Sequence, residues 1–281
     1  MLRIEHLTKH YKGSGKGVTD VSLHIHPGDL CAFIGHNGAG KTTTLKSLLG
    51  FVHPESGSVR FFGGDFNGSE QAVKQKIGYV SGGFDFYPAK KLKTITSVTR
   101  SFYDAWDEPT YRRCLRDFAL DENKTPAKLS AGMKVKYGLT LALSHGAELL
   151  ILDEPTSGLD PVSRDELLDL FLELRDRGVT ILFSTHIITD LEQCADRILY
   201  LRNGRIGADE EMKAFVNGYR LLTMTQEEKD RNDPSLLIGC KRRKEGFAAL
   251  IEADREGDVC GTVCHADPEA IMIHLEKEGE S

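Results

Sequence analysis

The sequence has no long hydrophobic run and no excess of positive charge. None of its apolar stretches approaches the roughly eighteen residues that a membrane-spanning helix needs, and its first residues, MLRIEH, lack the apolar core of a signal peptide. The formal net charge is −6, from 36 basic and 42 acidic residues, which argues against nucleic-acid binding or attachment to anionic lipid through a basic face. We therefore expect a cytosolic chain that would need a partner for any role at a membrane.

The six cysteines are scattered along the chain. Cys260, Cys264 and His265 lie close together in the sequence, but no second ligand pair follows at the spacing of a zinc site. Free thiols in a reducing compartment are therefore the simpler interpretation. The length of 281 residues, with 40% hydrophobic and 28% charged residues, fits a soluble globular protein. Such a chain can hold one large α/β domain with a small appendage, or two modest domains.

Residues 35–43, GHNGAGKTT, match the G-x-x-x-x-G-K-T pattern of a phosphate-binding loop. An apolar run at 30–34 predicts the strand before it, and residues 43–49, ended by Gly50, predict the helix after it. Glycines let backbone N–H groups close around phosphate oxygens, and the positive end of the helix dipole favours the same anion. Lys41 would reach the β- and γ-phosphates, and the Thr42 hydroxyl would ligate Mg²⁺. The expected nucleotide-binding residues of this loop are Gly35, His36, Asn37, Gly38, Ala39, Gly40, Lys41, Thr42 and Thr43.

Short strands alternate with helices on both sides of this loop. Alternation and apolar runs predict strands at 2–9, 21–25, 30–34, 57–62, 77–80, 148–154 and 179–184, helices at 163–177 and 187–194, and a hairpin turn at Asn203-Gly204. Between them, apolar residues at helical spacing at 94–106, 111–120 and 132–145 predict an inserted helical subdomain at about 87–146. The alternation favours an α/β fold with a mostly parallel sheet and helices on both faces.

The pattern weakens after Gly218, so we place a domain boundary there, with residues 1–218 as the main domain and 219–281 as a small C-terminal extension. Candidate strands in the extension lie at 220–224 and 259–263, and candidate helices at 245–253 and 268–277. The basic run at 241–244 is interpreted as a solvated turn, because four basic residues in an acidic tail are too few for a nucleic-acid patch.

A second cluster of polar residues follows the predicted strand at 148–154. Asp153 and Glu154 stand at the end of this apolar strand, where Asp153 would lie beside Mg²⁺, usually through water, and Glu154 next to the γ-phosphate. Glu154 could there polarise an attacking water molecule. The alternative, that the two carboxylates cap a helix N-terminus, is weaker because the phosphate loop accompanies them.

The order of these motifs resembles that of the ATP-binding cassette (ABC) ATPases that power membrane transporters. Residues 129–133, LSAGM, look like the family's signature, commonly LSGGQ, and residues 157–160, SGLD, look like its D-loop. Residues 184–186, STH, end in what looks like the switch histidine, His186, which senses the γ-phosphate. Tyr11 occupies the place of the aromatic residue that stacks on adenine. The resemblance covers about residues 1–218. The form of the signature in this chain, LSAGMK at 129–134, is similar to that of single-cassette exporters.

The resemblance implies a P-loop NTPase cassette with a mostly parallel sheet core, an antiparallel β subdomain, an inserted helical subdomain and a small C-terminal α+β tail. It implies a Mg²⁺-dependent ATPase with ATP and Mg²⁺ as cofactors, catalytic residues Lys41, Glu154 and His186, and metal ligands Thr42 and Asp153. Two cassettes would stack head to tail, so that Ser130 and Gly132 contact ATP across the interface. Asp160 of the D-loop is a further expected nucleotide-binding residue. A separate transmembrane permease would hold the chain on the inner face of the cell membrane, and no nucleic acid is expected as a partner.

The sequence departs from the family at two positions. Ser81-Gly82-Gly83 stands where the family usually carries a glutamine that senses Mg²⁺ and couples to the permease, so we expect reduced hydrolysis and looser coupling. Restoring a glutamine at Gly82 is expected to raise turnover. Ala131 replaces a signature glycine, and the sequence does not decide whether its methyl group widens the interface.

The aromatic loop at 84–88 and the helical block are the expected docking surface for the permease. The alternative is that these aromatic residues pack into the helical subdomain. Two other functions remain open: a soluble ABC ATPase acting in translation or DNA repair, and a regulatory cassette that binds ATP without hydrolysis. The chain lacks the second cassette and the long coiled coil that mark the soluble types. The presence of Glu154, Asp160 and His186 argues against the regulatory type.

Overall fold

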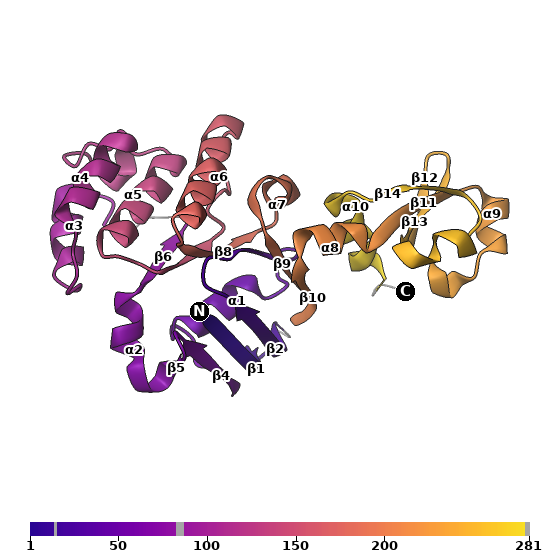
Figure 1. The fold of residues 1–281 in the computed structure, drawn as a ribbon, viewed down its shortest axis with the longest axis horizontal. Coiled ribbons are helices and arrows are strands. Elements are labelled where there is room, and N and C mark those ends of the chain that lie inside the picture. The colour runs from indigo at the N-terminus through magenta and orange to yellow at the C-terminus, as the bar shows by residue number, and fades with distance from the viewer. Residues whose placement is uncertain (14–15, 83–86, 279–281) are drawn as a thin grey trace. The chain divides into compact units, whose positions relative to one another are not determined.

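The computed structural model describes residues 1–13, 16–82 and 87–278 and divides into two compact units, Met1–Asp209 and Glu210–Ser281 (Figure 1). The division lies within strand β10 (Arg205–Glu211), whereas the sequence pattern placed it after Gly218. In the described part of the chain, no helix is long and apolar enough to cross a membrane.

The first unit is built on a six-stranded sheet with the order β10-β9-β3-β8-β7-β6. The pairs β3–β8, β3–β9, β7–β8 and β6–β7 are all parallel. The other strands of this sheet are β3 (Leu30–Ile34), β6 (Ile77–Ser81), β7 (Leu149–Asp153), β8 (Thr180–Thr185) and β9 (Arg197–Arg202). Their continuous apolar runs are buried, as expected for parallel strands covered on both faces. The carboxyl ends of β3, β7 and β8 therefore meet at one edge of the sheet.

A second, antiparallel sheet has the order β2-β1-β4-β5 and shares a hydrophobic core with the first. Its strands are β1 (Leu2–His10), β2 (Gly17–Ile25), β4 (Ser56–Phe61) and β5 (Gly64–Asp65). Helix α1 (Lys41–Leu48) contributes Leu45 and Leu48 to this core. The sequence did not indicate helix α2 (Phe66–Gln75), because only Phe66 and Val73 of its ten residues are buried.

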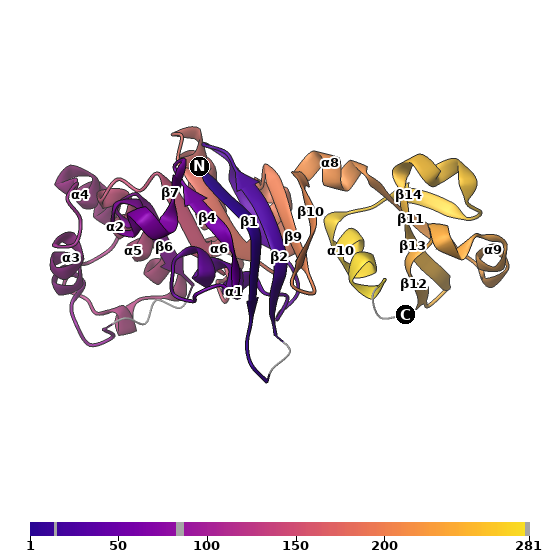
Figure 2. The same ribbon diagram turned by 90° about the horizontal axis from the view of Figure 1, so that it is seen from below.

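The helical subdomain consists of α3 (Leu92–Arg100), α4 (Glu108–Asp117) and α5 (Ala131–Ser144), with its own core around Tyr137. Both views place these helices together beyond β6, the edge strand of the parallel sheet (Figure 1, Figure 2). The helix expected at 94–106 ends at Arg100, and Phe102 is 70% exposed although it fits the helical spacing.

Two further helices and a hairpin complete the first unit. Helix α6 (Pro161–Asp176) follows β7, and α7 (Ile188–Cys194) follows β8. The expected hairpin between β9 and β10 is confirmed: Asn203 and Gly204 both have positive φ, 48° and 75°, as a tight two-residue turn requires. The predicted architecture, a mostly parallel sheet core with an antiparallel β part and an inserted helical subdomain, is thus confirmed.

The second unit contains a four-stranded antiparallel sheet with the order β12-β13-β11-β14. Its elements are α8 (Met212–Asn217), β11 (Tyr219–Met224), α9 (Gln226–Arg231), β12 (Ile238–Arg243), β13 (Gly246–Glu252), β14 (Thr262–His265) and α10 (Pro268–Lys277). The prediction of a helix at 245–253 is wrong. This segment forms the inner strand β13, which pairs with β11 and β12 and is buried along its apolar run. The helix expected at 268–277 is confirmed as α10. Cys260 and Cys264 are free and exposed, and no group of three or more metal-ligating side chains lies together among the described residues.

The core of the helical subdomain generates a test of the fold. The buried Tyr137 hydroxyl lies 2.9 Å from Thr96 Oγ1 and 3.0 Å from the carbonyl oxygen of Leu92. Tyr137→Phe should lower the free energy of unfolding by about 1–3 kcal/mol, because two buried hydrogen bonds are lost, although Thr96 Oγ1 keeps the Tyr111 hydroxyl at 3.1 Å. Urea unfolding followed by fluorescence of Trp106, which packs against this core, measures the change.

Tyr87→Phe is the control, since Tyr87 is 67% exposed and should change stability by less than about 0.5 kcal/mol. Equal urea midpoints for Tyr137→Phe and the wild-type protein would contradict the packing described for this subdomain.

Candidate functional site

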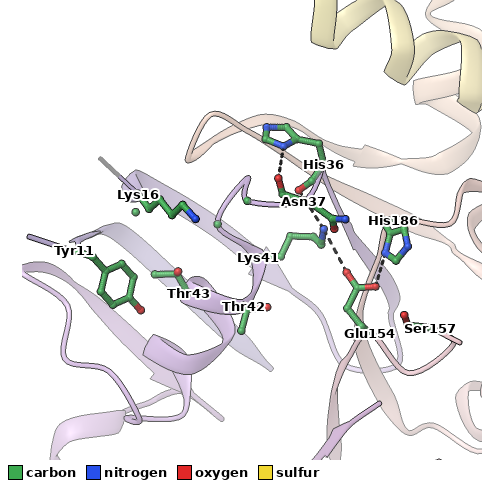
Figure 3. Close-up of a pocket in the computed structure, with 13 residues that line it drawn as sticks. Tyr11, Lys16, His36, Asn37, Lys41, Thr42, Thr43, Glu154, Ser157 and His186 are labelled. Carbon is green, nitrogen blue, oxygen red and sulfur yellow. Dashed lines mark hydrogen bonds and ion pairs between the residues drawn. The ribbon is translucent and has the colours of Figure 1, made fainter. Parts of the chain in front are cut away.

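A cavity of about 490 Å³ opens where the carboxyl ends of the parallel strands meet the phosphate loop. Figure 3 shows its lining residues, with Tyr11 and Lys16 at one end and Glu154, Ser157 and His186 at the other. The lining consists of Tyr11, Lys16, Gly17, His36, Asn37, Gly38, Gly40, Lys41, Thr42, Thr43, Glu154, Ser157 and His186. Ten of these residues had been singled out in the sequence. Lys16 and Gly17 had not, because no motif marks Lys16 or the start of β2 at Gly17, and Ser157 had been noted only as part of the D-loop motif.

The phosphate loop has the backbone that its glycines permit. Gly40 has a φ of 114°, a backbone conformation that residues with a side chain rarely adopt. A Cβ atom there would also lie 2.4 Å from Val18 Cγ1, which is too close for van der Waals contact. Gly38 has a φ of 92°, and a Cβ atom built on it would meet no atom within 4 Å. Helix α1 begins directly afterwards at Lys41, which leaves its first backbone N–H groups at the cavity.

The Lys41 side chain is only 6% exposed. Its Nζ atom donates to the carbonyl oxygen of Gly35 at 2.6 Å and lies 3.4 Å from Glu154 Oε1. In Figure 3 the two side chains point toward each other across the cavity. A buried ammonium group is costly unless anions surround it, so this arrangement suits a site that receives further negative charge.

Asp153 ends β7 beside two hydroxyl groups. Ser184 Oγ, fully buried on β8, donates to Asp153 Oδ1 at 2.8 Å, and Thr42 Oγ1 lies 3.4 Å from the same oxygen. Hydroxyl and carboxylate oxygens are the ligands that Mg²⁺ prefers, and Mg²⁺ usually completes its shell with phosphate and water. Thr42 and Asp153 therefore fit a magnesium ion.

Glu154 lies next to His186 at the edge of the cavity. His186 Nδ1 is 2.7 Å from Glu154 Oε2, and because an ionised carboxylate only accepts, Nδ1 carries the hydrogen in this contact. Glu154 has a φ of 52°, an unusual conformation for a residue with a side chain, and its N–H donates to Ser184 Oγ at 2.9 Å. Neither Asp153 nor Glu154 caps a helix, since the N-cap of the next helix, α6, is Asp160.

Ser130, Gly132 and Asp160 do not belong to the cavity lining in the described part of the chain. Ser130 is the N-cap of α5 and accepts from the N–H of Met133 at 3.2 Å. Asp160 accepts from the N–H of Val162 and of Ser163, and hydrogen bonds from Ser163 hold the pKa of its carboxyl group below the usual value. Both residues thus stand at a helix N-terminus and outside the lining of this cavity.

Gly82 occupies the position of the missing glutamine. Its N–H donates to the carbonyl oxygen of Asp153 at 2.9 Å, and a Cβ atom on it would lie 2.2 Å from the carbonyl oxygen of Glu154. A glutamine at Gly82 would therefore displace the backbone of Glu154, so the expected gain in turnover on restoring it is not supported by this geometry. Three residues earlier, burial and then the charge of Asp153 raise the pKa of Tyr79 to about 12, which keeps its hydroxyl neutral.

Comparisons with known proteins agree with this geometry. Residues 18–157 match the family described as "ABC transporter". The bacitracin transport ATP-binding protein BcrA of Bacillus licheniformis is 34% identical over 209 residues, which cover 73% of this chain and 68% of that protein. The uncharacterized ABC transporter ATP-binding protein YxlF of Bacillus subtilis is 34% identical over 260 residues, covering 89% and 83%.

Among solved structures, an ATP-binding subunit of an ABC transporter is 30% identical with a TM-score of 0.68, covering 76% of this chain and 91% of that one. The cassette MJ0796, in a dimeric post-hydrolysis state bound to ADP and Pi, has a TM-score of 0.66, and the match covers 75% of this chain and 99% of MJ0796. At 24% identity, this likeness supports the fold alone. The chain therefore belongs to the ABC transporter family and has the fold of its ATP-binding cassettes.

Proposed function

We propose that this chain binds and hydrolyses ATP as the energy-coupling subunit of a membrane transporter. The observation that carries the proposal is the buried Lys41 ammonium group, which faces the Glu154–His186 pair inside one cavity lined by the phosphate loop. Tyr11, 39% exposed at the other end of that cavity, offers a ring face on which adenine can stack.

The residues divide the work of hydrolysis among them. Backbone N–H groups of residues 35–43 and Lys41 hold the β- and γ-phosphates. Thr42 and Asp153 would hold Mg²⁺, which would supply positive charge to the phosphate oxygens. Glu154 accepts a proton from water as the water oxygen attacks the γ-phosphorus, and the bond to the bridging oxygen breaks to release ADP. His186, bonded to Glu154, orients this carboxylate and senses the γ-phosphate.

A second cassette completes the site in this proposal. Ser130 and Gly132 stand at the N-terminus of α5, and Asp160 at that of α6, outside the cavity of their own chain. The N–H groups and dipole of a helix N-terminus attract phosphate, so these ends are suited to an ATP held by another cassette.

A separate permease is the proposed membrane partner, and export is the proposed direction. The Nod factor export ATP-binding protein I of Burkholderia thailandensis is 35% identical over 204 residues, and other relatives are named for bacitracin and carnitine transport. These names support a role in transport. In such a complex the subunit would lie in the cytoplasm, against the inner face of the membrane.

A groove beside the helical subdomain is the proposed docking surface. It has a volume of about 520 Å³ and is lined by Glu70, Gln71, Lys74, Gln75, Phe102 and Tyr103. Phe102 is 70% exposed and Phe51 is 59% exposed. The Nζ atom of Lys74 lies over the Phe51 ring, 5.9 Å from the ring centroid. Exposed aromatic residues beside polar ones are typical of interface centres. Of the aromatic loop expected to dock, residues 84–86 lie outside the described residues, and Tyr87 is exposed.

Steady-state hydrolysis tests the proposed activity. The purified chain should hydrolyse ATP with Mg²⁺ at a rate that rises faster than linearly with protein concentration, because two copies share each site. Glu154→Gln should lower the turnover number by about 10²–10⁴-fold, since it removes the general base, while ATP binding persists. Phosphate release measured over a hundredfold range of protein concentration shows both effects, and a Glu154→Gln variant as active as the wild-type protein would refute the role of Glu154.

A photo-crosslinking amino acid tests the docking surface. Placed at Phe102 in the native host, it should crosslink the chain to an integral membrane protein with several transmembrane spans. Mass spectrometry of the crosslinked product identifies that protein. The same group at Val98, 53% exposed on α3 but outside the groove, is the control and should give little of this product. Equal crosslinking from both positions would argue against the groove as the docking site.

A further inference from the structure

A fully buried carboxylate, Asp190 on α7, lies behind the candidate site rather than in it. Its Oδ2 atom accepts from the hydroxyl of Thr156 at 2.6 Å and from the hydroxyl of Thr185 at 3.1 Å. Its Oδ1 atom makes no hydrogen bond among the described residues but lies 3.0 Å from Arg164 Nε, as an ion pair. One carboxylate thus joins three separate segments of the chain.

Two of these segments carry the proposed catalytic pair. Thr156 follows Glu154 by two residues, and Thr185 directly precedes His186. Both threonines are buried, so water does not compete for their bonds to Asp190. The segments of Glu154 and His186 are therefore connected in two ways. One is the direct 2.7 Å contact between the two side chains, and the other runs through the hydrogen bonds of Thr156 and Thr185 to Asp190.

The third segment is the start of α6. Arg164 lies one helical turn after Asp160, and its N–H donates to the carbonyl oxygen of Asp160 at 3.0 Å. The Arg164 guanidinium group also donates to the hydroxyl of Thr189, next to Asp190. A movement of the first turn of α6 therefore acts directly on the carboxylate that holds the Glu154 and His186 segments.

We propose that Asp190 is a positioning residue that fixes the distance between Glu154 and His186 and links it, through Arg164, to the first turn of α6. The proposal rests on the proposed ATPase function, in which Asp160 on that turn faces the second cassette. Contact of the second cassette with α6 then sets the geometry of Glu154 and His186, so that ATP hydrolysis depends on the association of two cassettes.

The energetics favour a positioning role over simple filling of the core. Burial raises the pKa of the Asp190 carboxyl group, while the hydrogen bond from Thr156 and the charge of Arg164 oppose that rise. An apolar side chain of similar size would fill this space without the cost of a buried charge. What the carboxylate adds is a set of directed bonds to three loops.

A matched contact separates the two roles. Gln193 Nε2 on α7 donates to Asp165 Oδ1 on α6 at 2.7 Å, so it joins the same two helices without reaching the Glu154 or His186 segments. Loss of this bond tests the packing of α6 on α7, whereas Thr156→Val and Asp190→Asn test the link to the catalytic pair.

The first measurement is ATP turnover by the full chain with Mg²⁺. Thr156→Val and Asp190→Asn should lower kcat by about tenfold to a hundredfold with KM for ATP within about threefold of wild type, because a small misplacement of catalytic groups affects the chemical step. Gln193→Ala should leave kcat within about twofold. Melting temperatures show whether each variant folds, and if Asp190→Asn does not, Thr156→Val carries the test.

The second measurement does not depend on activity. With ¹⁵N-labelled histidine, the His186 signal, assigned through a His186→Gln variant, should report the Nδ1–H tautomer in the wild-type chain and in Gln193→Ala. Thr156→Val should shift it toward the Nε2–H tautomer that an unconstrained imidazole prefers. An unchanged tautomer together with unchanged kcat, or an equal loss in Gln193→Ala, would overturn the proposal. A wild-type chain without ATPase activity would instead refute the proposed function, and the tautomer would still decide the role of Asp190.

Discussion

The burial of one ammonium group is the constraint on which the site depends. Lys41 is 6% exposed and is held by the Gly35 carbonyl oxygen and by Glu154, which a strand far away in the sequence brings to it. Charge in such surroundings is stable only with matching anions, so the phosphate loop, the end of β7 and the turn after β8 have to meet at one point. Parallel strands β3, β8 and β7 accomplish this, because their neighbouring carboxyl ends open on the same edge of the sheet.

Buried hydroxyl groups then fix the geometry of the acidic residues. Ser184 both donates to Asp153 and accepts from the N–H of Glu154, which holds Glu154 in its left-handed conformation. On the other side, Gly82 leaves room for the carbonyl oxygen of Glu154, where a side chain would not fit. The absence of a glutamine at this position is thus part of the local packing as well as a departure from the family pattern. These contacts are between strands, so the site is as rigid as the sheet that carries it.

Much of this arrangement could be predicted from sequence, and the misses share a physical cause. Strand β3 was expected at the residues where it lies, and Asp153 and Glu154 at the end of a strand, because strong local signals mark both. Strand β13 was taken for a helix, since a short apolar run fits either structure and only pairing with β11 and β12 decides. Nor did any pattern single out the contacts of Ser184 and Asp190, which join residues that only the fold brings together.

The central claim is that Lys41 is buried for a polyphosphate ligand and not for the fold. Thermal unfolding of Lys41→Met with and without ATP and Mg²⁺ tests it most directly. The wild-type protein should gain several degrees in Tm with ATP, since a ligand at a hundred times its Kd stabilises by about 2.7 kcal/mol. Lys41→Met should unfold without nucleotide within a few degrees of wild type, because Glu154, whose side chain is 26% exposed, keeps His186 as its partner when the ammonium group is removed. The variant should gain nothing from ATP. A variant that collapses without nucleotide, or that keeps the full ATP shift, would contradict the account.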